Sequence, residues 1–181
     1  KLGLMKKKSK SNDVVLRAND MKFDNGASYS GAIKDVFDTR PHGFGTYFYP
    51  DCFENGQDHL YRGNFKNAKF HGYGEYVSKE YNYKGEFKNQ KFHGKGEYSK
   101  EGYLYKGNFK NDKPDGKGEE IIFEKDSIYI GTFKNGLRHG YGISKSYKNK
   151  KDKSHFKGQW VNGLRSGFGT FDFGDGGIYK G

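Results

Sequence analysis

The chain has 181 residues, of which 18% are aromatic, while all hydrophobic residues together make up only 32%. This composition excludes an ordinary core of Leu, Val and Ile, so Tyr and Phe must provide most of the buried surface. The net charge of +11 is concentrated in residues 1–28, with seven Lys or Arg against three Asp, and in residues 145–157, with six Lys against one Asp. The rest of the chain is therefore close to neutral.

The single cysteine, Cys52, excludes an intrachain disulfide and suits a reducing compartment. No apolar segment approaches the ~20 residues of a membrane-spanning helix. The basic start of the chain is not followed by the apolar segment of a signal peptide. We therefore expect a protein that is neither secreted nor membrane-spanning.

In chain order, residues 1–28 form a basic segment and residues 29–181 form a repeat array. We expect the basic segment to be partly disordered or to cap the array. The array begins with a loose copy, YSGAIKDVFDTRPHGFGTY, at Tyr29. The next copies are YRGNFKNAKFHGYGEY from Tyr61, YKGEFKNQKFHGKGEY from Tyr83 and YKGNFKNDKPDGKGEE from Tyr105. The last full copies are YIGTFKNGLRHGYGIS and FKGQWVNGLRSGFGTF.

These last two copies begin at Tyr129 and Phe156, and Tyr179 opens a further unit that the sequence truncates. The starts are 32, 22, 22, 24, 27 and 23 residues apart, a period that indicates a repeat architecture. Ile33 replaces a ring in the first unit, Pro114 and Asp115 replace Phe-His in the fourth, and Ser166 replaces His in the sixth.

Each unit alternates large and polar residues on both sides of a polar segment, in most units Lys-Asn, which predicts a β-hairpin. In an extended strand Tyr83, Gly85 and Phe87 share one face, so the glycines leave slots between the rings. We expect the rings of one hairpin to cover the glycine backbone of the next one and to form a continuous ladder. The ladder residues are Tyr61, Gly63, Phe65, Tyr83, Gly85, Phe87, Tyr105, Gly107, Phe109, Tyr129, Gly131, Phe133, Phe156, Gly158 and Trp160.

The opposite face tests the register of the hairpins. Placing Tyr83 opposite Tyr98 also pairs Arg62 with Glu75, Lys106 with Glu119 and Ile130 with Ile143. Cross-strand pairs of this kind are worth about 0.2–1 kcal/mol each. The apolar pair makes the surface around it a candidate partner-binding patch, and local packing against residues 144–155 is the alternative. The candidate partner-binding residues are Ile130, Tyr141, Ile143, Tyr73 and Phe168.

The pattern Tyr-x-Gly-x-Phe or Trp followed by Gly-x-Gly every 22–24 residues resembles the MORN repeat, over residues 29–181. The resemblance implies an all-β fold, an elongated single-layer solenoid of stacked antiparallel β-hairpins with a shallow groove. It also implies a role as a scaffold or adaptor of cytoskeletal, ciliary or membrane-apposed structures, and proteins similar to this one often dimerise. We therefore expect a cytoplasmic protein, associated with the cytoskeleton or peripheral to a membrane.

Catalytic and metal chemistry find no support in the sequence. The recurring residues His71, His93 and His139 lie two strands apart in the expected sheet, roughly 9–10 Å, too far to share one zinc ion. The Gly-x-Gly segments do not open a helix, so they lack the N-terminus that binds a nucleotide phosphate. We expect no enzyme activity and no cofactor, and we do not expect nucleic-acid binding, because the regular rings are used in the ladder.

Two classes of function remain open. The first is a protein-interaction scaffold or adaptor, with a protein partner in the groove or on the aromatic face and a homodimer as one form. The second is a module for anionic phospholipids such as phosphoinositides, in which lysine clusters contact the headgroups, with a solvated tail and loop as the alternative. Those lysines are Lys6, Lys7, Lys8, Lys148, Lys150, Lys151 and Lys153. A regulatory repeat domain of a longer enzyme is compatible with both.

Overall fold

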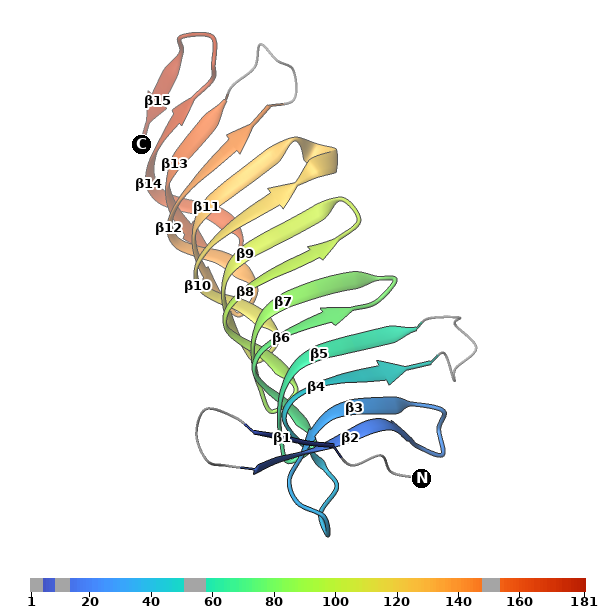
Figure 1. Cartoon of the computed structure of the whole chain (residues 1–181). Helices are drawn as coiled ribbons and strands as arrows, with labels where there is room; N and C mark the ends of the chain where they lie inside the picture. The colour runs from blue at the N-terminus through green and yellow to red at the C-terminus, as the bar shows by residue number, and fades with distance from the viewer. Residues whose placement is uncertain (1–4, 9–13, 51–57, 148–153) are drawn as a thin grey trace. The chain divides into compact units, whose positions relative to one another are not determined.

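The computed structural model describes residues 5–8, 14–50, 58–147 and 154–181, with side chains from residue 15 onward. The chain divides into two units, Lys1–Lys91 and Phe92–Gly181. Both units consist of antiparallel β-hairpins, with a single 3₁₀ turn among the described residues (Figure 1). The predicted all-β fold of stacked hairpins is therefore confirmed.

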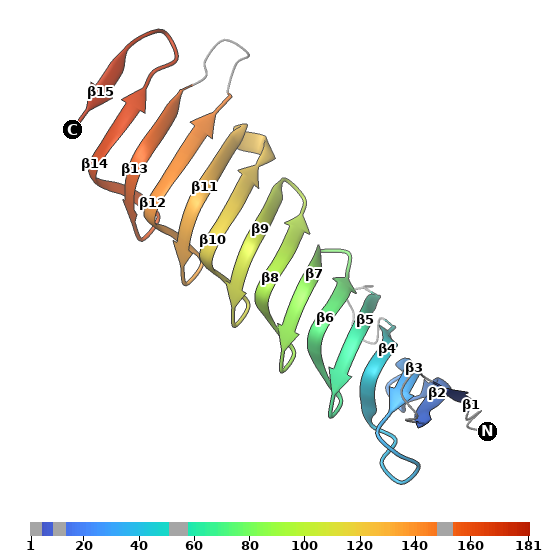
Figure 2. The ribbon, with the colours of Figure 1, turned by 60° about the vertical axis from the view of Figure 1, so that its left-hand side comes forward.

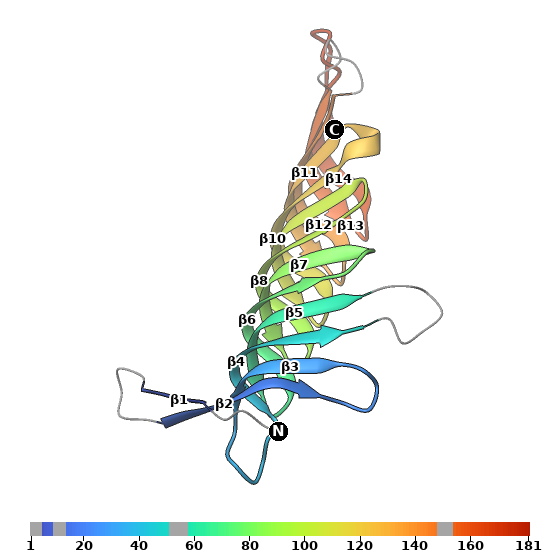
Figure 3. The same ribbon diagram turned by 45° about the vertical axis from the view of Figure 1, so that its right-hand side comes forward.

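In unit 1 each strand pairs antiparallel with its neighbour in the chain. Strand β2 pairs with β1 through residues 14–17 and with β3 through residues 17–22 (Figure 3). Two strands thus lie within the basic segment 1–28. The strands are β1 (Met5–Lys8), β2 (Val14–Lys22), β3 (Ser28–Ile33), β4 (Pro41–Tyr49), β5 (His59–Lys66), β6 (Lys69–Val77) and β7 (Tyr81–Lys88).

Unit 2 repeats this arrangement, and its strands follow one another side by side (Figure 2). The short helix η1 (Phe123–Lys125) closes the connection between β10 and β11. The strands are β8 (Lys91–Lys100), β9 (Tyr103–Lys110), β10 (Lys113–Ile122), β11 (Ser127–Lys134), β12 (Leu137–Ser146), β13 (His155–Val161), β14 (Leu164–Asp172) and β15 (Ile178–Lys180).

Two-residue turns close the hairpins β5–β6, β7–β8, β9–β10, β11–β12 and β13–β14, and both turn residues have positive φ, whereas residues 34–40 connect β3 to β4. In the β5–β6 turn these residues are Asn67, with φ 51°, and Ala68, with φ 61°. In the β11–β12 turn they are Asn135 and Gly136, with φ 51° and 88°. Such turns match the right-handed twist of the paired strands. The predicted Lys-Asn turn is therefore present in both units.

The second turn residue also connects each hairpin to the one before it. The Gly136 N–H donates to the carbonyl of Pro114 at 2.8 Å, and the Gly163 N–H donates to the carbonyl of Arg138 at 2.8 Å. In unit 1 the Ala68 N–H donates to the carbonyl of Pro41 at 2.9 Å. The turns therefore fix the spacing of successive hairpins as well as closing them.

In the repeats that begin with tyrosine at 61, 83, 105 and 129, this first ring is the most buried side chain. Tyr61, Tyr105 and Tyr129 are each 0% exposed. Their hydroxyls donate to the carbonyl three residues later, from Tyr61 to Asn64 at 2.8 Å and from Tyr129 to Thr132 at 3.0 Å. A tyrosine in a straight strand does not reach that carbonyl, so each strand bends around its ring.

The rings do not cover the glycines of the next hairpin as we expected. A Cβ added to Gly63 or to Gly74 would lie 2.5 Å from the hydroxyl oxygen of Tyr61, in the same hairpin. These two glycines face each other across β5 and β6, so the pair without side chains is what allows the bend. The expectation was wrong because a flat strand was assumed, whereas a bent strand folds over its own ring.

Contacts between hairpins come from the second ring of the next repeat. Tyr61 packs against Phe65 of its own strand, with centroids 5.0 Å apart, and against Phe87 of β7 at 5.1 Å, both edge-to-face. In unit 2, Tyr129 contacts Phe133 at 5.1 Å and Trp160 at 5.1 Å in the same way. Edge-to-face pairs add about 0.5–1.5 kcal/mol each beyond burial. The aromatic ladder predicted from the sequence is therefore present in each unit.

Candidate functional site

We call the side of each unit that carries the buried rings the ladder face, and the opposite side the outer face. The predicted register is confirmed for Ile130, which faces Ile143 across β11 and β12. Ile121 of β10 faces both Leu104 of β9 and Ile128 of β11. Side chains that face each other in this way are close enough to pack. These residues make up an apolar outer-face cluster, which comprises Leu104, Ile121, Ile128, Ile130, Tyr141 and Ile143.

Charged residues border the outer-face cluster. Glu119 pairs with Ile130 from β10, and Lys157 pairs with Ile143 from β13. Ile130 is 48% exposed and Tyr141 is 55% exposed, so both side chains present apolar surface to solvent. An exposed apolar patch with a polar rim is typical of a surface that binds another molecule.

The corresponding row of unit 1 is charged instead. Arg62 faces Glu75, as the sequence predicted, and Glu75 faces Lys84 with an N–O distance of 2.5 Å. Among its described residues, unit 1 also has an apolar row on this face, in which Leu60 faces Phe48 on β4 and Val77 on β6. What distinguishes unit 2 is thus the additional apolar row of Ile130 and Ile143, which does not follow from the repeat itself.

The other predicted contact residues lie on strands that do not contribute to this cluster. Tyr73, on β6 of unit 1, is 53% exposed, and Phe168, on β14 of unit 2, is 84% exposed. Strand β1 includes the backbone of Lys6, Lys7 and Lys8, but their side chains lie outside the described residues. The second lysine cluster, within 148–153, also lies outside them.

On the ladder face, unit 2 contains an ion pair that sequence reasoning missed. Arg138 occupies the place that Phe70 has in unit 1, where that ring stacks on Tyr61 at 3.7 Å. Its guanidinium lies 4.8 Å from the ring centre of Tyr129, and its Nε and Nη2 donate to Glu120 Oε2 at 2.7 and 2.6 Å. The side chains of this pair are only 20% and 14% exposed, so a cation replaces a ring without remaining unpaired.

Arg165 occupies the same place one repeat later. Its guanidinium lies 4.8 Å from the ring centre of Phe156 and 4.9 Å from that of Phe171. Its Nη2 donates a hydrogen bond to Ser144 Oγ at 3.4 Å. Burial lowers the pKa of the Arg165 guanidinium from its ordinary value, and the charge of Arg138 lowers it further. The sequence signal for both arginines was the change from Lys-Phe-His-Gly to Leu-Arg-His-Gly and Leu-Arg-Ser-Gly.

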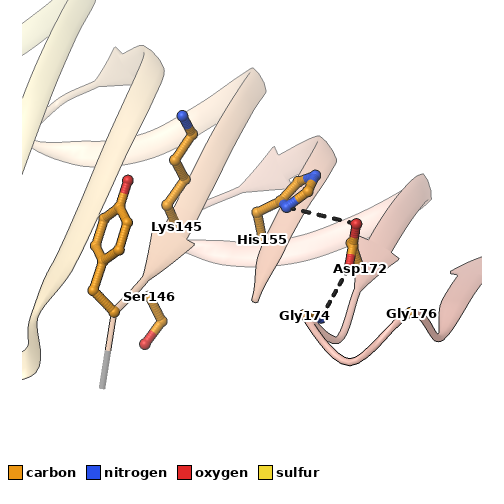
Figure 4. A pocket seen from close by; sticks show the side chains of 7 residues that line it. Lys145, Ser146, His155, Asp172, Gly174 and Gly176 are labelled. Atoms are coloured by element: carbon orange, nitrogen blue, oxygen red, sulfur yellow. Dashed lines mark hydrogen bonds and ion pairs between the residues drawn. The ribbon is translucent and has the colours of Figure 1, made fainter. Parts of the chain in front are cut away.

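A cleft of about 520 Å³ lies at the ends of β12, β13 and β14. Figure 4 shows its side chains, with His155 Nδ1 4.0 Å from Asp172 Oδ2. The other oxygen of Asp172 accepts the Gly174 N–H at 2.8 Å. Among the cleft residues described, no nucleophile is paired with a base.

Metal-binding clusters and membrane-spanning helices are both missing from the described part of the chain. Within those ranges, no group of three or more His, Cys, Asp or Glu side chains could bind a metal ion. Among the same residues, no helix has the length and apolar character needed to cross a membrane.

Comparison with known proteins identifies the repeats and one set of relatives. The family model for the MORN repeat matches residues 36–51, 61–82, 83–101, 105–122, 129–149 and 156–178. Alsin from Homo sapiens is 31% identical over 153 residues, as is alsin from Rattus norvegicus. The match covers 84% of this chain but only 6% of the length of these relatives. Because the family model matches well over half of the sequence, this chain belongs to the MORN-repeat family.

Proposed function

We propose that this chain is a non-catalytic protein-interaction scaffold, or adaptor, that binds a protein partner through the outer-face cluster of unit 2. The observation that supports this proposal is the apolar pair Ile130 and Ile143, in a row where unit 1 has charged pairs. Burial of apolar surface is worth about 25 cal/mol per Å², so covering this cluster favours association. Family membership supports the same role, with a cytoskeletal or membrane-apposed assembly as the setting.

The test removes the apolar surface while keeping strand-forming side chains. We expect the Ile130→Thr, Ile143→Thr double variant to lose at least about tenfold in affinity for its partner, equivalent to ~1.4 kcal/mol. The matched control is Leu60→Thr, Val77→Thr, which changes a cross-strand apolar pair on the outer face of unit 1. Partners would be identified by quantitative affinity purification with both variants, and binding of each purified partner would be measured by calorimetry.

Retention of the same partners and affinities by both double variants would contradict the proposal. Co-sedimentation with vesicles of phosphatidylserine and phosphatidylcholine would be measured in parallel at physiological salt. Binding to anionic but not to neutral vesicles, unchanged by the Ile130 and Ile143 substitutions, would instead favour the phospholipid module. Light scattering would show whether the wild-type chain is a dimer and whether the double variant changes its mass.

A further inference from the structure

In two consecutive repeats of unit 2 an arginine lies at the same position, but the side chain beside its guanidinium differs. In the first, Arg138 has a carboxylate partner, because Glu120 lies between Tyr105 and Tyr129 in the sheet. In the second, the residue at the equivalent position is Ser144, which lies between Tyr129 and Phe156. Arg165 therefore has a hydroxyl at 3.4 Å where Arg138 has a carboxylate at 2.6–2.7 Å.

The rings around Arg165 hold its guanidinium in place. Phe156 and Phe171 lie 4.8 and 4.9 Å away, and Trp160 lies 5.8 Å away, all within the range of a cation–π contact. Within the part of the chain that the structure describes, Arg165 makes no ion pair, and the residue is nevertheless exposed. The result is a positioned cation with a free side toward solvent.

We propose that Arg165 is a docking position for the carboxylate side chain of an acidic partner segment, which would occupy the place that Glu120 occupies beside Arg138. In the neighbouring repeat two guanidinium nitrogens, Nε and Nη2, contact one carboxylate oxygen of Glu120, and Arg165 has the same donors. Burial and the charge of Arg138 both lower the pKa of Arg165, and a bound carboxylate offsets both effects. This site lies on the ladder face and is independent of the outer-face cluster.

A carboxylate fits better than a phosphate. Arg138 is already paired with Glu120, so the site offers one unpaired guanidinium and no cluster of cations among the described residues. Ser144 is only 8% exposed, and three aromatic rings surround the guanidinium, so the position favours a small planar anion between apolar groups. A phosphate group carries up to two charges and is usually bound by several donors.

The test uses the wild-type chain and a short synthetic peptide in which glutamate alternates with serine, with a glutamine–serine peptide as the control ligand. Trp160 is the single tryptophan, so its fluorescence reports on this site without a label. We expect the glutamate peptide to change Trp160 emission saturably at low ionic strength, and the glutamine peptide to leave it unchanged. Added salt should weaken this binding.

Variants separate the charge from the packing. Arg165→Met keeps a long side chain over the rings, and we expect it to weaken peptide binding at least about tenfold. Ser144→Glu supplies an internal carboxylate, so it should abolish peptide binding and raise the melting temperature. Lys134→Gln removes one positive charge from the same unit near a turn and should leave binding unchanged.

Three results would overturn the proposal. One is that Arg165→Met and Ser144→Glu both bind the peptide as the wild-type chain does. If Arg165→Met does not fold, unchanged binding by Ser144→Glu alone overturns the proposal. Another is binding of anionic vesicles or inorganic phosphate at this site without binding of the glutamate peptide. The third is equal loss of binding in Lys134→Gln. The Ile130→Thr, Ile143→Thr variant should bind the peptide normally, so failure of the scaffold proposal and failure of this one are distinguishable.

Discussion

At the scale of single residues, the pairs of facing glycines are what permit the buried tyrosines. Tyr129 is 0% exposed, and a Cβ on either Gly131 or Gly142 would overlap its ring. The sixth repeat has Phe156 in the same place, where a Cβ on Gly158 would approach the ring carbon Cζ at 2.6 Å. Phe156 has no hydroxyl, so the repeat requires the space that the glycines leave for the ring. The hydroxyl hydrogen bond of the other repeats adds further stability.

Gly142→Ala should therefore destabilise unit 2 by about 3 kcal/mol, because the buried ring and the strand cannot both keep their positions. The matched control is Gly136→Ala in the adjacent turn, where nothing lies within 4 Å of the added Cβ. That control has only the cost of φ +88°, about 1 kcal/mol. Urea unfolding followed by Trp160 fluorescence measures both changes. Equal losses in the two variants would mean that the glycine pair is not required for packing.

At the scale of elements, the hairpin turns differ in quality from repeat to repeat. The β11–β12 turn has Asn135-Gly136, the sequence that best suits two residues with positive φ. The β5–β6 turn has Asn67-Ala68 in the same conformation, and Ala68 is exposed. An alanine held at φ 61° is strained, and its N–H is also needed for the bond to Pro41.

Ala68→Gly should stabilise unit 1 by about 0.5–1 kcal/mol, since it relieves the strained φ at a smaller entropic cost and leaves the N–H in place. The free energy of unfolding in urea, followed by circular dichroism, measures the gain. Gly136→Ala is the reverse substitution at the equivalent position of unit 2 and should act in the opposite direction. A loss of stability in Ala68→Gly would show that the β5–β6 turn tolerates alanine without strain.

At the scale of the whole molecule, burial of tyrosine replaces the usual burial of aliphatic side chains. Burial raises the pKa of Tyr61 and Tyr105 well above the ordinary value, and it raises the pKa of Tyr49 to about 12. In the unfolded chain these hydroxyls ionise near pH 10. The folded state therefore binds their protons more tightly than the unfolded state does.

Because the folded pKa values are raised, the protonated buried tyrosines contribute their full stabilisation of the folded state below about pH 10. This stabilisation is lost as the pH rises above that value. For each such tyrosine the free energy of unfolding falls by about 1.4 kcal/mol per pH unit between its unfolded and folded pKa values. We expect alkaline unfolding between about pH 10 and 12, with tyrosinate absorbance and loss of far-ultraviolet circular dichroism changing together. Tyrosine ionisation with an unchanged dichroism spectrum would contradict this.

The sequence by itself determined the repeats, the hairpins, their register and the ladder residues. These properties are local or periodic: alternation sets the faces of a strand, Asn at the turn sets the hairpin, and opposite charges such as Arg62 and Glu75 align the two strands. The apolar pair of Ile130 and Ile143 followed from the same register.

The tertiary structure alone decided which groups meet across repeats. Glu120 and Arg138 come from different hairpins and meet only because successive hairpins stack at a fixed spacing. The pairing of Ile121 with Ile128, which belongs to the next hairpin, widens the outer-face cluster for the same reason. The bend that places Tyr61 over its own glycines was also beyond the sequence pattern, because alternation specifies the face of a side chain and not the curvature of the strand.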